Sequence, residues 1–313
     1  MTRTLLLAAL VAAVLAGGCG LGAGEEQPGG VWLTVSRDFG THELGRNRRD
    51  TVPGGETVMR LLQRSFDVET RFGGNFVQQI NGVAGGRRAG RPVDWFYYVN
   101  GVEAGVGAAE RRISPGDRVW WDHHDWGVTF RVPAVVGAFP EPFLSGIEGK
   151  RLPVRLDCVR AAEAACDEVR RRLAIADVVK VSTGLLGGSA GEAVLRVVVG
   201  RWTDIRRDPA VQLIERGPAQ SGVYATMSEA GSRLTLLEAD GTTARTVGAG
   251  AGLVAATRLE GQQPTWVVTG TDQVGLAAAA AQLEQSALQD RFAVAVEDGR
   301  AEGVPVVAEP EEP

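Results

Sequence analysis

The spacing of apolar residues divides the first third of the chain into strands around a single helix. Val31, Leu33 and Val35 occupy every second position, which is typical of a strand with one buried face. After the turn at residues 53–55, apolar residues at positions 58, 61, 62 and 66 follow a helical spacing. This spacing predicts a helix whose apolar face lies on a sheet.

Two Asn-Gly pairs then mark hairpins, Asn81-Gly82 after the apolar stretch 76–80 and Asn100-Gly101 after the stretch 95–99. Asn-Gly favours the tight turn between antiparallel strands because both residues tolerate a positive φ angle. A last strand is predicted at residues 118–124. The order strand, helix and three strands predicts a β-grasp domain over residues 31–132, in which the first and last strands are parallel neighbours.

The rest of the chain predicts a linker, a second domain and a tail. Three prolines, at positions 133, 140 and 142, lack a backbone donor, so residues 133–149 are expected to form a linker. The α/β domain is expected over residues 150–300, and the acidic tail 301–313 is expected to be disordered. In the α/β domain we predict strands at 154–156, 178–182, 193–199, 222–227, 233–238, 244–247, 253–257, 265–269 and 292–296, and helices at 160–173, 209–216 and 272–290. The fold class is therefore α+β, an N-terminal β-grasp domain followed by an α/β domain with a mixed sheet.

Length and charge agree with two folded domains. The chain has 313 residues, of which 44% are hydrophobic and 23% are charged, values close to those of globular proteins. The formal net charge is −5, which argues against a nucleic-acid partner because nucleic-acid binders carry a positive field.

The amino terminus has the pattern of an export signal. Arg3 precedes an apolar run at residues 5–16, and Gly17-Gly18-Cys19 follows it. Residues 15–19 resemble the lipobox of bacterial lipoproteins, in which the cysteine is lipidated and becomes the first residue of the mature chain. We therefore expect a signal peptide at 1–18, a lipid on Cys19, a tether at 19–30 and an extracytoplasmic location at the cell membrane. An unmodified secreted protein and a retained membrane anchor are the alternatives.

Two cysteines remain once Cys19 is assigned to the lipid. Cys158 and Cys166 can form a disulfide between a strand and the following helix, as the oxidising compartment allows. The alternative is that both are small buried apolar residues.

All three histidines fall in the first domain. His42 follows the first predicted strand, and His123 and His124 end the last one, flanked by Asp122 and Asp125. If those strands are parallel neighbours, these side chains reach one edge of the sheet, where imidazole and carboxylate can bind zinc or another divalent metal. The alternative is a polar strand end, in part because successive residues of a strand point to opposite faces.

Aromatic residues gather in the same domain. One face of the predicted strand 95–99 is needed for the core, which leaves the other face for a ligand, a partner or the second domain. The candidate ligand surface consists of Trp95, Tyr97, Tyr98, Asn100, Trp120, Trp121 and Trp126.

A family resemblance rests on two segments of this domain. WFYYVNGVEAG at residues 95–105 and ISPGDRVWW at residues 113–121 combine an aromatic strand, an Asn-Gly turn and a Gly-Asp turn that leads into a second aromatic strand. This pattern resembles the transcobalamin-like C-terminal domain family. The resemblance covers about 100 residues and implies a β-grasp fold and cobalamin or another cofactor as the ligand.

No motif predicts an enzyme. Residues 187–191 fit G-x-S-x-G, but a strand follows them where that motif needs a helix. We therefore expect a non-enzymatic lipoprotein that binds a small molecule or docks a membrane transport partner. The alternative is an envelope protein with a structural or protein-binding role and no small-molecule ligand.

Overall fold

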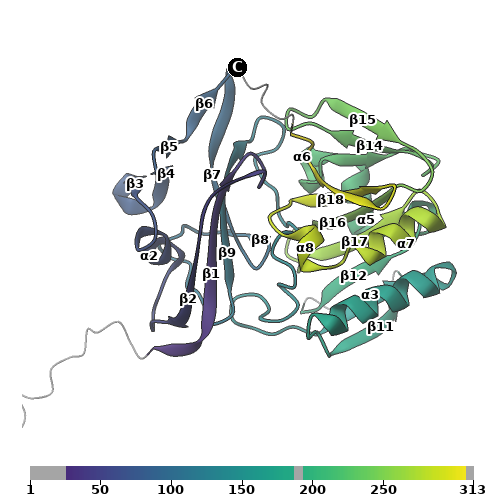
Figure 1. Ribbon diagram of the computed structural model, residues 1–313, viewed down its shortest axis with the longest axis horizontal. Coiled ribbons are helices and arrows are strands. Elements are labelled where there is room, and N and C mark those ends of the chain that lie inside the picture. Colours follow the sequence, from purple (N-terminus) through teal and green to yellow (C-terminus); the bar gives the residue numbers. More distant parts are fainter. Residues whose placement is uncertain (1–25, 187–192, 308–313) are drawn as a thin grey trace, which may run out of the picture.

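The computed structural model describes residues 26–186 and 193–307. Figure 1 shows two units side by side, each built around its own large sheet. We call residues 27–125 the N-terminal unit and residues 154–304 the C-terminal unit. The fold class is α+β, as the sequence predicts. The predicted signal peptide, Cys19 and residues 187–191 lie outside the described residues.

The N-terminal unit has a six-stranded sheet in which β1 lies between β2 and β9. Its path runs β2-β1-β9-β7-β6, and β8 pairs with β7. The first strand and β9 are parallel, with Arg37 opposite His123, as expected for a β-grasp. The strands are β1 (Gln27–Arg37), β2 (His42–Val52), β6 (Gly86–Arg88), β7 (Arg91–Val99), β8 (Val102–Glu103) and β9 (Arg118–Asp125).

One short helix and a small sheet cover one face of this large sheet. The helix begins after Thr57, whose hydroxyl accepts a hydrogen bond from the backbone N–H of Arg60. Its buried residues Leu61 and Leu62 pack in one cluster with Leu33. These elements are α2 (Val58–Gln63), β3 (Val68–Arg71), the 3₁₀ turn η1 (Phe72–Gly74), β4 (Phe76–Ile80) and β5 (Val83–Ala84).

The C-terminal unit has a seven-stranded mixed sheet of order β11-β10-β12-β17-β16-β18-β19. The pairs from β11 to β17 are parallel and the remaining pairs are antiparallel. The strands are β10 (Val154–Cys158), β11 (Val181–Leu185), β12 (Leu195–Val199), β16 (Gly252–Thr257), β17 (Thr265–Gly270), β18 (Ala293–Glu297) and β19 (Arg300–Val304).

Both faces of this sheet are buried. Val197 and Val199 pack with the face covered by α3 (Glu163–Ile175), α7 (Gln273–Ala281) and α8 (Gln285–Leu288), and η2 (Arg160–Ala162) precedes α3. Val198 packs with the opposite cluster, which explains why residues 197–199 of β12 are three successive valines. The opposite face carries α4 (Trp202–Ile205), α5 (Pro209–Glu215), α6 (Pro218–Ser221) and the small sheet of β13 (Ala225–Met227), β14 (Leu234–Leu237) and β15 (Thr243–Val247).

The segment expected to be a linker is instead part of the core. Val135, Val136 and Phe139 are each no more than 2% exposed. The backbone N–H of Val135 donates to the carbonyl of Gly101 in the N-terminal unit, and that of Val136 donates to the carbonyl of Phe292 in the C-terminal unit. The prolines do prevent regular secondary structure, but the apolar residues between them bury the segment between the units.

Two domain boundaries and one helix also differ from the prediction. β1 already begins at Gln27, inside the expected tether, and β19 extends to Val304, inside the expected tail. The predicted helix 272–290 is two helices, α7 and α8. Within the part of the chain that the structure describes, no helix has the length and apolar character needed to cross a membrane.

Candidate functional site

The three histidines occupy the predicted edge of the sheet but do not share a site. The Nδ1 atom of His42 lies 3.5 Å from a carboxylate oxygen of Asp38. The Nε2 atom of His123 is 3.1 Å from the carbonyl oxygen of Ala84, and burial lowers the pKa of His123. The Nδ1 atom of His124 lies 2.9 Å from Oδ1 of Asp122.

Strand geometry separates His123 from His124. The ring of His123 packs against Trp95, whereas the ring of His124 stacks on Phe96 at a centroid distance of 4.5 Å and also contacts Phe292 of the other unit. In residues 26–186 and 193–307, no group of three His, Cys, Asp or Glu side chains is arranged to hold a metal ion. Within the described residues, the structure therefore does not bring His42, His123, His124, Asp122 and Asp125 together at one site.

Asp122 instead fixes the turn between β1 and β2. Its side chain is fully buried and accepts hydrogen bonds from the hydroxyl of Ser36 and from the backbone N–H groups of Phe39 and Gly40. The indole N–H of Trp120 donates to the Ser36 hydroxyl at 2.8 Å. These bonds compensate the burial of a carboxylate, so they indicate a structural role.

Asp125 and Asn100 also serve the fold. Asp125 pairs with Arg91 and accepts from the backbone N–H of Gly127 at 2.7 Å. Asn100 is fully buried in its turn, and its amide donates to Asp117 and to the carbonyl of Gly146, each at 2.8 Å. Asn100 is therefore not part of an exposed ligand surface.

The outer aromatic face of β7 and β9 is covered by the C-terminal unit. Tyr98 and Trp120 are 1% and 3% exposed, and both contact the ring of Phe292. Tyr224 and Phe39 complete this cluster. The prediction that Tyr98 and Trp120 belong to a ligand surface is therefore wrong, because the two units pack together through them.

The opposite aromatic face forms the core, except at one end. Trp95 and Trp121 are 6% and 3% exposed and pack in the cluster that contains α2. Tyr97 stacks on Trp121 with ring centroids 4.8 Å apart and is only partly buried. A hollow opens at this end of the sheet. We call it the aromatic groove; it has a volume of about 430 Å³ and is lined by residues 75–77, 95–97, 103–108, 121, 130 and 131.

The rim of the aromatic groove exposes apolar side chains. Phe130 and Val106 are 66% and 50% exposed, and the ring of Phe130 contacts the edges of Phe96 and Trp126. The hydroxyl of Tyr97 donates to the carbonyl of Val106, which ties the loop after β8 to the sheet. Burial raises the pKa of Tyr97, so this hydroxyl stays protonated at neutral pH.

One ion pair lies at the end of the groove. The guanidinium of Arg131 bonds a carboxylate oxygen of Glu103 at 3.0 Å. Burial raises the pKa of Glu103, and Arg131 acts in the opposite direction. The groove thus offers aromatic and aliphatic surface with one polar end. The sequence pattern finds Tyr97 and Trp121 but misses Val106 and Phe130, which stand in loops without periodicity.

The structure also joins Cys158 at the end of β10 to Cys166 in α3 by a disulfide. The predicted disulfide is therefore present, and the two cysteines are not merely small buried apolar residues. The disulfide lies in the C-terminal unit, away from the residues that line the aromatic groove.

Comparisons with known proteins add a family match to part of the chain. No curated protein matches it. A solved structure from Ruminococcus gnavus ATCC 29149, described as a "putative metal binding protein", resembles 31% of this chain and 97% of its own, at 14% sequence identity and a TM-score of 0.24. The TM-score is too low to show a shared fold. Residues 55–125, which run from the turn before α2 to the end of β9, match the family described as "Domain of unknown function (DUF4430)".

Proposed function

We propose that the protein is an extracytoplasmic lipoprotein, anchored by a lipid on Cys19, that binds a small molecule in the aromatic groove without catalysing a reaction. The export pattern of residues 3–19 supports the location. The observation that carries the binding role is Phe130, a large apolar side chain that is two-thirds exposed beside a hollow lined by aromatic rings.

The lining favours a ligand with a flat apolar part. The ring of Tyr97 and the side chains of Val106 and Phe130 can contact such a part, while Arg131 and Glu103 can bond a polar group at the end of the groove. The resemblance of residues 95–105 and 113–121 to transcobalamin-like domains supports cobalamin or another cofactor with a planar ring system. Such a protein can pass its ligand to a membrane transporter.

The test is ligand binding to full-length protein in mild detergent, measured by titration calorimetry and thermal melting with cobalamins and haem. We expect at least one of these ligands to raise the melting temperature, because a ligand of the folded state stabilises it. Replacing Phe130→Ala is expected to weaken that binding by roughly tenfold, the effect of about 1.4 kcal/mol of lost aromatic contact.

Phe72→Ala is the matched control, because Phe72 in the N-terminal unit is 81% exposed and does not line the groove. The control variant should bind like the unchanged protein. Equal weakening by both substitutions, or no binding by any ligand of the panel, would contradict the proposal and favour an envelope protein with a structural or protein-binding role.

A further inference from the structure

A second hollow lies where the two units meet, on the other face of the N-terminal sheet. It has a volume of about 410 Å³. We call it the crevice. Strands β1, β2 and β9 supply one wall. Residues 137 and 138 of the buried segment 133–149 and residues 285, 289 and 290 in and after α8 supply the other. Its lining includes Trp32, Arg46, Arg48, Arg118, Gln285 and Asp290.

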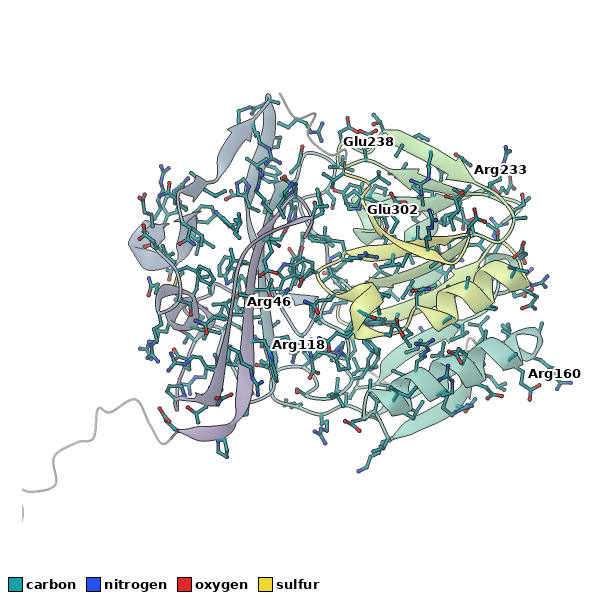
Figure 2. The ribbon with its side chains drawn as sticks, viewed as in Figure 1. Arg46, Arg118, Arg160, Arg233, Glu238 and Glu302 are labelled. Carbon is teal, nitrogen blue, oxygen red and sulfur yellow. A yellow bond between two sulfur atoms is a disulfide. The ribbon has the colours of Figure 1, made fainter. Side chains whose placement is uncertain are left out.

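Strand register places three arginines on one wall. Trp32 lies opposite Arg48 on β2 and opposite Arg118 on β9, so the three side chains share a face of the sheet. The guanidinium carbons of Arg48 and Arg118 lie 5.3 and 5.4 Å from the centre of the indole ring. Arg46 is two residues from Arg48 on the same strand and therefore faces the same way. In Figure 2, Arg46 and Arg118 lie on the side of the sheet that faces the C-terminal unit.

Arg118 is a partly buried cation whose hydrogen-bond partners are neutral. Its guanidinium donates to the carbonyl of Phe139 and to the side-chain oxygen of Gln285, both at 3.3 Å. Within the described residues no carboxylate lies within ion-pair distance of it, although the charge of Glu141 acts on it from further away. Burial lowers the pKa of Arg118, which means that the surroundings provide less compensation for the positive charge than water does.

The crevice has more positive than negative groups. Asp290 is the one carboxylate among the residues that line it, and Arg46 already pairs with Asp290. Burial raises the pKa of Asp290, and the guanidinium of Arg46 acts in the opposite direction. Arg48 has Asp50 at 3.4 Å, an exposed pair of little strength.

We propose that the crevice binds a small polyanion with at least two carboxylate or phosphate groups. Guanidinium groups bond both kinds of group through paired N–H donors. Arg118 and Arg48 lie on either side of Trp32, so two anionic groups of one molecule can engage them separately. The side-chain amides of Gln285 and Gln289 supply further donors from the C-terminal unit. The ligand thus contacts both units.

The test is titration calorimetry of the full-length protein in mild detergent with citrate and with inorganic pyrophosphate, at constant ionic strength. Acetate is the monovalent control. We expect citrate, pyrophosphate or both to bind, and acetate to bind at least tenfold more weakly. Binding of citrate alone identifies carboxylates as the recognised groups, and binding of pyrophosphate alone identifies phosphates.

Variants on one strand provide the matched comparison. Arg48→Gln removes an exposed guanidinium from the crevice and is expected to weaken polyanion binding about tenfold. Arg49→Gln makes the same charge change on the opposite face of β2, because Arg49 lies opposite the core residue Val31, and it should leave binding unchanged. Arg118→Gln should weaken binding more than Arg48→Gln.

Two results would overturn the inference. One is no heat of binding with either polyanion, and the other is equal weakening by Arg48→Gln and Arg49→Gln, which would mean attraction by diffuse charge. The groove variant Phe130→Ala should bind the polyanion normally, so this test and the test of the aromatic groove give separate answers.

Discussion

At the scale of single residues, the polar end of β9 is committed to the fold. Residues 122–125 are four successive buried polar side chains, each 7% exposed or less. Asp122 holds the β1–β2 turn and His124 lies between aromatic rings of both units. A cluster of His and Asp in a sequence is therefore as compatible with internal packing and hydrogen bonds as with a metal, and only the direction of each side chain distinguishes the two.

His123 should make stability depend on pH. Burial lowers the pKa of His123 below its ordinary value of 6.5, so the unfolded chain takes up a proton at a higher pH than the folded chain does. The contribution of neutral His123 to the free energy of unfolding is fully present above about pH 6.5. It is lost as the pH falls towards the pKa of His123 in the folded chain. The free energy of unfolding should decrease in this window by at most about 1.4 kcal/mol per pH unit.

Urea unfolding of the unchanged protein and of His123→Gln at pH 7.5 and 5.5 measures this contribution. Glutamine keeps a donor for the carbonyl of Ala84 but does not titrate. Burial also raises the pKa of carboxylates such as Asp94 and Glu103. Their effect on stability is the same in both proteins, so it cancels when the free energies of unfolding are subtracted. The stability of the variant should change less between the two pH values. Parallel changes would show that His123 does not titrate differently on unfolding.

At the scale of elements, the regular strands and helices follow from local pattern. The parallel pairing of β1 with β9 and the two Asn-Gly turns agree with the prediction, because each depends on nearby residues or on the order of the elements. The strand β2 could not be found this way. Its sequence HELGRNRRDTV has little apolar alternation, since it is an edge strand paired with β1 alone.

The disulfide between β10 and α3 is the element-scale feature most open to measurement. It closes a loop across a sequence separation of eight residues. Replacing both cysteines, Cys158→Ser and Cys166→Ser, should lower the free energy of unfolding by roughly 2 to 3 kcal/mol, the chain-entropy effect of a loop of this size. Urea unfolding measures the loss, and a reducing agent should produce a similar loss in the unchanged protein. If the double variant and the reduced protein are as stable as the oxidised protein, the bond does not stabilise the fold.

At the scale of the whole molecule, the cover of the aromatic face and the position of the crevice depend on how the units pack. Phe292, the residue before β18, contacts Phe39, Tyr98 and Trp120, which lie more than 170 positions away in the chain. No periodicity links such residues, so the sequence predicts an excess aromatic face but not what covers it. The crevice is unpredictable for the same reason, because it combines β1, β2 and β9 with residues near α8.

Phe292→Ala should loosen this packing. The side chain is 3% exposed, so its removal should cost about 3 to 5 kcal/mol, the typical loss for a buried Phe cut back to Ala. The melting temperature should fall by several degrees, and limited trypsin digestion should reach Arg131 and Lys150, which flank the buried segment 133–149, more rapidly. Phe72→Ala is again the exposed control. Unchanged melting and digestion would show that the units are held together elsewhere.

The packing of the two units also brings Gly40 close to Asp290. A Cβ atom at Gly40 would lie 1.9 Å from the carbonyl oxygen of Asp290, and the φ angle of Gly40 is +85°. Only glycine suits both conditions, because a side chain would collide with the C-terminal unit and strain the turn. The β1–β2 turn is thus shaped by the other unit as well as by Asp122.

The position of β1 between β2 and β9 also bears on the order in which the chain can fold as it leaves the ribosome. β1 and β2 are made first and can form a hairpin early, but the inner edge of β1 must wait for β9, whose first residue follows 81 positions after the last residue of β1. Until then that edge is an open template for other extended chains, and closing so long a loop is slow. The newly made chain therefore has a vulnerable interval that ends when residues 118–125 emerge.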